Sequence, residues 1–322
     1  MTDAPVLAAE RLAVSIRGME LVSRVDVEVG AGQCLAIAGE SGSGKTVTCR
    51  SFVGLLGRLG GEVSGGRLLL GGEDVSRDDE RAWRSRRGRA VALVPQASLA
   101  SLNPVVRVGS QMVETIRALG GARAARGRAL ELLEQVRLDD PERVFRSYPH
   151  QLSGGMRQRV MIALSIAGRP RLLVADEPTT ALDVTVQRQI LALLRDLQRA
   201  SGMALVFVTH DLSVVREIAD RVAVMYAGET IETGPVADVL QRPLHPYTRA
   251  LLAADPTTAP RGRPLSEVPG KPADPRSWPA GCRFQPRCEH AREECAAPAP
   301  LRSFGGSRAA ACHRVEQIGE GR

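Results

Sequence analysis

The stretch that decides the fold is Gly39-Glu40-Ser41-Gly42-Ser43-Gly44-Lys45-Thr46, which matches G-x-x-x-x-G-K-[ST]. It follows an apolar segment, Cys34 to Ala38, expected to be a buried strand, and it precedes a helical run from Thr46 to Leu56. Glycines let the backbone curl so that N–H groups point at phosphate oxygens, and the following helix presents its positive end to the same anion. Lys45 would add a cation for the β- and γ-phosphates, and Thr46 a hydroxyl for Mg²⁺. An ordinary glycine-rich turn is the alternative, but both flanks favour the phosphate loop.

A second segment, Leu172 to Glu177, is an apolar run that ends in two adjacent carboxylates, Asp176 and Glu177. Because side chains alternate along an extended strand, the two acids can perform different tasks. We expect Asp176 to hold Mg²⁺ through its water shell and Glu177 to polarise a water molecule for in-line attack on the γ-phosphate. A strand that merely ends at the solvent would look the same, so the catalytic interpretation depends on the phosphate loop.

A third segment, Gln151 to Arg159, contains the turn Ser153-Gly154-Gly155, which precedes a helix expected over Val160 to Ala167. A helix that opens on such a turn offers another anion site. One small chain cannot easily wrap two such sites around one nucleotide. The sequence therefore predicts a dimer that shares ATP between the phosphate loop of one subunit and Ser153, Gly154 and Gly155 of the other.

Short apolar strands alternate with amphipathic helices over residues 1–240, which predicts an α/β domain with parallel strands covered by helices. The start of the chain is rich in strands and glycine turns, whereas residues 98–167 have helical character and form an expected subdomain. Twelve of the 20 prolines lie between residues 243 and 300, so we expect residues 241–322 to be an appended, loop-rich module without long helices beyond Leu252.

Taken together, the motifs resemble those of the ATPase subunits of ABC transporters, in the same order and over residues 12–240. The resemblance implies an α/β fold of the P-loop NTPase class and ABC type, with a β-rich N-terminal part, an inserted helical subdomain and a small C-terminal cysteine module. The segments that carry it besides the phosphate loop and the carboxylates are Leu152-Ser153-Gly154-Gly155 (the signature, with Met156 where Gln is common), Val94-Pro95-Gln96 (the Q-loop), Ala181-Leu182-Asp183 (the D-loop) and Val208-Thr209-His210-Asp211 (the switch histidine).

This resemblance implies roles that spacing alone does not. Gln96 would sense Mg²⁺ and water while it contacts the membrane subunit, His210 would contact the γ-phosphate, and Asp183 would belong to the nucleotide-binding set. Ile16 stands where the family often stacks an aromatic residue on adenine. An aliphatic contact there would lose stacking energy on the order of 1 kcal/mol, which affects nucleotide affinity more than catalysis.

Further segments resemble the oligopeptide/dipeptide branch of this family, which includes nickel importers. They imply ATP-driven import of peptides, with nickel or another small solute as the alternative. The implied partners are two transmembrane permease subunits, a second ABC ATPase that is a related but distinct chain, and an extracytoplasmic solute-binding protein. The segments are Leu102-Asn103-Pro104, Tyr148-Pro149-His150, residues 176–187 and His245-Pro246-Tyr247-Thr248.

Four cysteines, Cys282, Cys288, Cys295 and Cys312, occur in the C-terminal module with the spacing C-x₅-C-x₆-C-x₁₆-C. In a reducing compartment this grouping favours a metal site over disulfides. Four thiolates can hold a [4Fe–4S] cluster or a tetrahedral Zn²⁺ ion, and the spacing differs from the C-x₂-C of zinc ribbons. Some relatives in the peptide-importer branch carry an iron–sulfur cluster at matching cysteines, so the resemblance favours a structural [4Fe–4S] cluster over zinc or metal-free thiols.

The net charge of +7 comes with 43 basic residues, of which only Lys45 and Lys271 are lysines. Arginines cluster at residues 84–89 without interleaved aromatic residues, so we expect a solvated face and no nucleic-acid partner. A soluble ABC ATPase acting on DNA or ribosomes is the alternative of a different class, although such proteins usually pair two ATPase domains in one chain. No apolar stretch reaches the roughly 18 residues that span a bilayer, and no secretory signal opens the chain. We expect a peripheral protein at the cytoplasmic face of the inner membrane.

Overall fold

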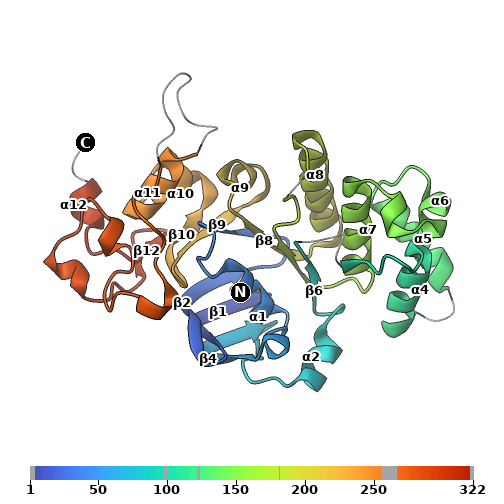
Figure 1. The fold of residues 1–322 in the computed structure, drawn as a ribbon, viewed down its shortest axis with the longest axis horizontal. Coiled ribbons are helices and arrows are strands. Elements are labelled where there is room, and N and C mark those ends of the chain that lie inside the picture. The colour runs from blue at the N-terminus through green and yellow to red at the C-terminus, as the bar shows by residue number, and fades with distance from the viewer. Residues whose placement is uncertain (1–3, 97–100, 122–123, 181, 256–266, 320–322) are drawn as a thin grey trace. The chain divides into compact units, whose positions relative to one another are not determined.

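The computed structural model describes residues 4–96, 101–121, 124–180, 182–255 and 267–319 (Figure 1). The chain divides into two compact units, residues 1–77 with 207–322 and residues 78–206. The division falls inside strand β8 (Ala204–Thr209), whose residues are all buried.

The first unit contains an antiparallel sheet with the strand order β2-β1-β4-β5. Its strands are β1 (Leu7–Ile16), β2 (Met19–Val29), β4 (Gly61–Leu70) and β5 (Glu73–Asp74). The β1–β4 register shifts between Glu10 and Ala13, where Arg11 takes a φ of 48°. Gly66 lies opposite this bulge with a φ of 71°, and a Cβ atom there would come within 2.2 Å of the Arg11 carbonyl oxygen. Only glycine fits this close approach of two backbones.

A second sheet of the first unit has the order β11-β12-β10-β9-β3. Strand β3 (Cys34–Ala38) is buried throughout and runs parallel to β9 (Arg221–Tyr226), with Ala36 opposite Val222. A strand buried on both faces needs a continuous apolar sequence, which is what the chain supplies here. The other elements are α1 (Lys45–Phe52), a 3₁₀ turn (Gly57–Leu59), α9 (Leu212–Ile218), β10 (Glu229–Pro235), α10 (Val236–Gln241) and α11 (Pro246–Ala253).

The C-terminal module is short of regular structure, as its proline content predicts. It consists of 3₁₀ turns at Pro275–Ser277, Gln285–Arg287 and Glu293–Ala296, the short strands β11 (Arg302–Ser303) and β12 (Ala309–Ala310), and α12 (Val315–Gly319). β12 extends the sheet by pairing with β10, Glu232 lying opposite Ala310. Phe284 anchors the module against Tyr226 and Tyr247, with ring centroids 5.4 Å from each.

Among its described residues, the second unit contains two parallel strands and a group of α-helices (Figure 1). Its elements are α2 (Glu80–Arg86), β6 (Val91–Val94), α4 (Val108–Ala118), α5 (Ala125–Gln135), α6 (Pro141–Arg146), a 3₁₀ turn (Pro149–Gln151), α7 (Gly154–Ile166), β7 (Leu172–Asp176) and α8 (Val184–Ser201). The amphipathic α8 buries Ile190, Leu193, Leu194 and Leu197, as its periodicity predicts.

Two expected helices have different limits in the structure. The helix after the phosphate loop ends at Phe52 rather than Leu56, because Gly54 takes a left-handed φ of 65°. The helix expected over 160–167 begins six residues earlier, since Ser153 caps it by accepting from the Met156 N–H at 3.3 Å. Residues 98–100, within the expected helical subdomain, lie outside the described part of the chain.

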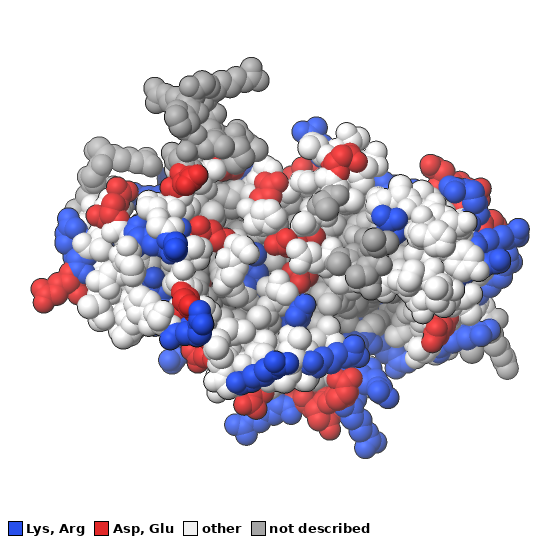
Figure 2. Space-filling view, viewed as in Figure 1, with Lys and Arg blue, Asp and Glu red and all other residues white. Residues whose placement is uncertain are grey.

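Two arginines of the cluster at residues 84–89 are paired with acids. Arg86 contacts Asp78 at 2.8 Å and Arg87 contacts Glu80 at 2.5 Å. Acidic and basic side chains are also interspersed over the face of the molecule in Figure 2. Within the described residues, no helix is both long and apolar enough to cross a membrane.

Candidate nucleotide site and cysteine module

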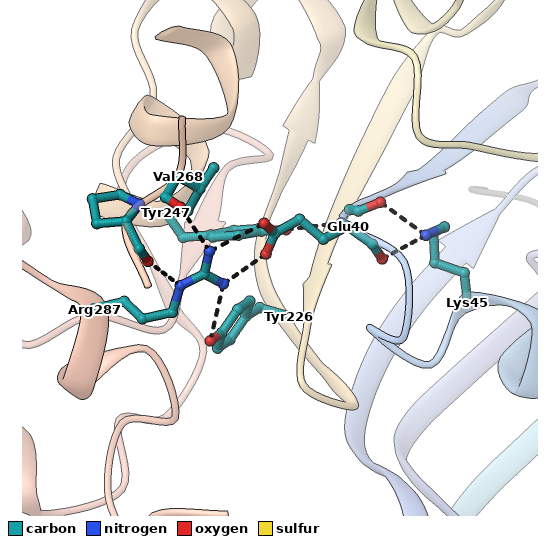
Figure 3. Close-up of polar contacts among 8 residues, drawn as sticks. Glu40, Lys45, Tyr226, Tyr247, Val268 and Arg287 are labelled. Atoms are coloured by element: carbon teal, nitrogen blue, oxygen red, sulfur yellow. Dashed lines mark hydrogen bonds and ion pairs between the residues drawn. The ribbon is translucent and has the colours of Figure 1, made fainter. Parts of the chain in front are cut away.

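The phosphate loop, residues 39–46, follows β3 directly and passes into α1, which is the context that the sequence predicts. Lys45 is buried, and its Nζ atom donates to the carbonyl oxygens of Gly39 and Glu40, each at 2.8 Å (Figure 3). The loop is also tied to the turn after β9, because the Gly228 N–H donates to the Ser43 carbonyl at 2.9 Å. The lysine ammonium is therefore held by the loop that would bind the phosphates.

Two glycines of this loop take backbone conformations in which any other residue would be strained. Gly39 has a φ of 151°, and a Cβ atom there would lie 2.2 Å from the Met225 carbonyl oxygen. Gly44 takes the left-handed N-cap position of α1 with a φ of 98°. The Ser43 hydroxyl is buried without a hydrogen-bond partner. A curled backbone at a helix N-terminus with an orphaned hydroxyl fits a bound phosphate group.

Gln96 and Glu177 lie together, although 81 positions separate them in the sequence. Val94 is paired with Ala175 in the parallel β6–β7 ladder, so the residues two positions further along each strand end up side by side. The Gln96 Nε2 atom donates to Glu177 Oε2 at 3.0 Å, and the Thr180 hydroxyl donates to the same oxygen at 3.0 Å. Glu177 has a left-handed φ of 46°, a conformation that costs on the order of 1 kcal/mol and is concentrated at functional sites.

The signature turn and the D-loop segment pack together within the second unit. Asp183 caps α8 by accepting from the Val186 N–H at 2.9 Å. Gly155, in the first turn of α7, faces Val186, and a Cβ atom added to it would lie 2.7 Å from Val186 Cγ1. No sequence pattern indicated this contact, because it depends on how α7 and α8 cross. Ala181, the first residue of the D-loop segment, lies outside the described residues.

The remaining predicted residues are placed as follows. Asp176 is the buried last residue of β7, and Thr46 is the second residue of α1. His210 is exposed and follows the end of β8, with Asp211 capping α9 behind it. Ile16 ends β1 and packs on Gly61, where an added Cβ atom would come within 2.9 Å of its side chain. Of the predicted catalytic residues, Gln96 and Glu177 are both in the second unit, and a side-chain hydrogen bond joins them.

The C-terminal module reaches the phosphate loop through an ion pair that the sequence does not reveal. Arg287 forms two contacts with Glu40, Nη1 to Oε2 at 2.7 Å and Nη2 to Oε1 at 3.1 Å (Figure 3). The Glu40 N–H also donates to the Tyr247 hydroxyl at 2.9 Å. Arg287 and Glu40 are 247 positions apart, and neither belongs to a motif that assigns it a partner.

All four cysteines of the module line one small cavity, together with His245 and His313. They are free thiols, and Cys282 donates its backbone N–H to the Cys295 carbonyl at 2.9 Å. Burial, together with the neighbouring thiolates, raises the pKa of Cys282 to about 11, and burial also raises the pKa of Cys288 and Cys312. Among the described residues, no group of three or more His, Cys, Asp or Glu side chains could hold a metal ion. The predicted metal is therefore not confirmed.

His245 forms part of the wall of this cavity. Its Nδ1 atom accepts from the Tyr247 N–H at 3.0 Å, whereas its Nε2 atom is buried without a hydrogen-bond partner. Burial lowers the pKa of His245 to about 3, so its imidazole is neutral. The cavity therefore brings four thiols and one ring nitrogen without a hydrogen-bond partner together.

Comparisons with known proteins agree with this geometry. Residues 22–180 match the ABC transporter family, and residues 231–295 match the family described as "Oligopeptide/dipeptide transporter, C-terminal region". A Brucella abortus (strain 2308) protein named "Putative peptide import ATP-binding protein" is 44% identical over 318 residues, covering 97% of this chain and 96% of the relative. A protein of the same name from Brucella melitensis biotype 1 is 45% identical over 316 residues, 94% of each chain.

Solved structures also resemble the chain. The ATP-binding cassette MJ0796, solved as a dimer in a post-hydrolysis state with ADP and Pi, matches with a TM-score of 0.61 and 27% identity over 71% of this chain and 98% of that one. The cbiO1 protein of Clostridium perfringens, part of the ABC transporter complex cbiONQ, matches with a TM-score of 0.64 and 25% identity over 74% and 91%.

Proposed function

Because the chain belongs to the ATP-binding proteins of ABC transporters, in the oligopeptide/dipeptide branch, we propose that it hydrolyses ATP to energise the import of peptides. The observation that carries the proposal is the Gln96–Glu177 hydrogen bond at the ends of two parallel strands, in a chain that also has a complete phosphate loop. We assign residues 1–240 to the ATPase domain, with a helical subdomain at about 98–167, and residues 241–322 to the extension.

Glu177 is the general base in this proposal. Gln96 and Thr180 both donate to its Oε2 atom and so orient the carboxylate, which would accept a proton from the attacking water. Thr46, Asp176 and Gln96 are the residues that would hold Mg²⁺, which supplies charge neutralisation at the phosphates. Lys45 binds the β- and γ-phosphates, and His210 contacts the γ-phosphate.

The test is Glu177→Gln in all catalytic sites of the assembled transporter. The glutamine keeps an oxygen that can accept from Gln96 and Thr180, so the loop conformation is retained while the base is lost. We expect ATP binding to persist and the steady-state turnover to fall by about 10²–10⁴-fold. Appreciable hydrolysis by the fully substituted complex would refute the assignment of Glu177.

We propose further that two ATPase subunits share each nucleotide, with Ser153, Gly154 and Gly155 of one facing the phosphate loop of the other and Asp183 beside them. The dimeric state of MJ0796 supports this arrangement. Ser41 is exposed on the phosphate loop, and Ser153 caps α7. A Ser41→Cys copy and a Ser153→Cys copy should crosslink when ATP is trapped by Glu177→Gln. Crosslinking that is equal without ATP, or no greater than in either single variant, would contradict the shared site.

For the C-terminal module we propose a structural [4Fe–4S] cluster bound by Cys282, Cys288, Cys295 and Cys312. Its support is the single cavity that the four thiols line. Each of the four thiolates would bind one iron of such a cluster. Protein purified anaerobically should be brown and contain iron and sulfide, and Cys295→Ser should bleach it. Colourless protein with stoichiometric zinc would favour zinc, and a metal-free protein would exclude both.

We place the protein at the cytoplasmic face of the membrane, bound to two permease subunits and paired with a second, related ATPase, while an extracytoplasmic binding protein delivers the peptide. The peptide-import name of the relatives and the matched C-terminal region support this placement. Purification with the permeases would test it. Salt-sensitive binding to nucleic acid in place of permeases would instead support a soluble ABC ATPase.

A further inference from the structure

Glu40, the second residue of the phosphate loop, is held from three directions (Figure 3). Its carboxylate contacts the Arg287 guanidinium in a two-bonded ion pair, its N–H donates to the Tyr247 hydroxyl, and its carbonyl oxygen accepts from Lys45 Nζ. The first two contacts come from the C-terminal part of the chain, and the third goes to the lysine that would bind phosphate. Glu40 therefore connects the extension to the nucleotide site.

The anchors of Glu40 are themselves firmly held. The Arg287 side chain is 4% exposed, and it also donates to the carbonyl oxygens of Val268 and Pro269 and to the Tyr226 hydroxyl. Tyr247 is fully buried, and its ring lies 4.7 Å from that of Tyr226 and 5.4 Å from that of Phe284. A guanidinium and a phenol fixed in this way cannot follow the loop if it moves, so they restrict the conformations of Glu40.

The backbone around Glu40 also positions Lys45. The N–H of Glu40 is bound by Tyr247, and the carbonyl oxygens on both sides of that residue's backbone, those of Gly39 and Glu40, are bound by Lys45 Nζ. A rotation of the loop at Glu40 would therefore displace two of the acceptors that hold the ammonium. A displacement of about 1 Å in a binding group is enough to weaken a phosphate contact.

We infer that Arg287 and Tyr247 are positioning residues for the nucleotide: by clamping Glu40, the C-terminal extension sets the affinity of the phosphate loop for ATP. The inference rests on the proposed function, since it requires that the loop binds ATP. It assigns the extension a role in nucleotide binding in addition to any role in holding a cluster.

The experiment compares variants of the full chain by titration with a fluorescent ATP analogue and Mg²⁺, and by the KM and kcat of the assembled transporter. Arg287→Met removes the charge but keeps much of the side-chain volume. Tyr247→Phe removes only the hydroxyl that accepts from Glu40. We expect Arg287→Met to raise the Kd and KM for ATP about tenfold, and Tyr247→Phe to raise them several-fold, with kcat changing less than twofold. Arg287→Lys should restore part of the affinity.

Arg308→Met is the matched control. Arg308 also belongs to the extension, its side chain is 14% exposed, and it pairs with a carboxylate of the ATPase domain, Glu232, at 3.6 Å. Glu232 lies on β10 and Arg308 directly precedes β12, and the pair does not touch the phosphate loop in the contacts described. Its loss tests whether loosening the extension in general lowers ATP affinity. Thermal unfolding and metal content are measured for each variant, because Arg287 adjoins Cys288.

The outcomes separate the possibilities. Weaker ATP binding in Arg287→Met and Tyr247→Phe, with Arg308→Met like the wild type, supports the clamp. Equal weakening in Arg287→Met and Arg308→Met would overturn it, as would unchanged affinity in both Arg287→Met and Tyr247→Phe. If Arg287→Met loses metal or unfolds, Tyr247→Phe decides the question, since its hydroxyl lies in the loop contact. Failure of the wild-type chain itself to bind ATP would overturn the proposed function instead.

Discussion

Gly154 and Gly155 are neighbours in the first turn of α7, yet they should respond oppositely to the same substitution. An added Cβ at Gly155 would lie 2.7 Å from Val186 Cγ1, whereas one at Gly154 would lie 3.5 Å from Leu182 Cδ2, an ordinary contact. Val186 is β-branched and stiff at χ1, so it cannot easily rotate away. Gly155→Ala should therefore introduce a steric clash with Val186, whereas Gly154→Ala should introduce none.

The magnitudes follow from two competing effects. Replacing glycine by alanine in a helix gains up to about 1 kcal/mol, and less in a first turn. Overpacking costs about 1–3 kcal/mol, so Gly155→Ala should lower the free energy of unfolding by roughly 1 kcal/mol. Gly154→Ala should raise it by about 0.5 kcal/mol.

Urea unfolding of the two variants, measured against the wild type under one set of conditions, checks this prediction. The double variant Gly155→Ala with Val186→Ala should unfold with little further loss beyond Val186→Ala alone, because the clash is gone. Equal changes in stability for Gly154→Ala and Gly155→Ala, or no rescue by Val186→Ala, would refute the packing argument. ATPase activity is not the readout, since both glycines are proposed to face nucleotide.

Three other substitutions have defined outcomes. Asp183→Ala removes the N-cap of α8 and should cost about 1 kcal/mol in urea unfolding, whereas Asp183→Asn should retain most of the stability, and equal losses would contradict the cap. Gly39→Ala, which would place a Cβ atom 2.2 Å from the Met225 carbonyl oxygen, should abolish ATP binding in a nucleotide titration, and retained affinity would show that the loop adapts. Burial raises the pKa of Glu232, so its carboxyl group stays protonated to a higher pH in the folded state than in the unfolded state. The stability that this difference contributes is complete below pH 4.5 and is lost as pH rises through the folded pKa. Glu232→Gln should flatten that part of the unfolding profile, and an unchanged slope would exclude Glu232 as its source.

The sequence was most informative where chemistry follows directly on a buried strand. The strand at Cys34–Ala38 was predicted with its observed limits, and the two carboxylates after Leu172 occur where β7 ends. Such short apolar strands have a clear local signature, and the residue that follows each one is determined by the chain itself. The helical limits were less accurate, because they depend on capping side chains such as Ser153 and on left-handed glycines such as Gly54.

Contacts between distant segments could not be predicted in this way. The distance between Gln96 and Glu177 depends on the pairing of Val94 with Ala175, and no local pattern specifies the register of two parallel strands. The family resemblance gave Gln96 a role at the site, but it did not predict the hydrogen bond to Glu177, and it gave no partner for Glu40. Glutamate in a glycine-rich loop and arginine beside a cysteine are both common at protein surfaces, so their pairing emerges only from the fold.

The clamp on Glu40 also gives a physical reason for an ATPase to keep its extension in contact with the phosphate loop. A glycine-rich loop can adopt many backbone conformations, and ordering it on nucleotide binding costs entropy. Anchors that are fixed before ATP arrives reduce that cost, since the loop is already held in one conformation. The anchors are Tyr247, in α11, and Arg287, beside a predicted cluster ligand. If the cluster orders the segment around Cys288, loss of the cluster should lower the affinity for ATP through Arg287. Cys295→Ser should then raise the Kd for ATP when introduced into the wild-type chain, but should raise it little further when introduced into Arg287→Met. Additive effects of the two substitutions on the Kd for ATP would show instead that the cluster acts on the nucleotide site by another route.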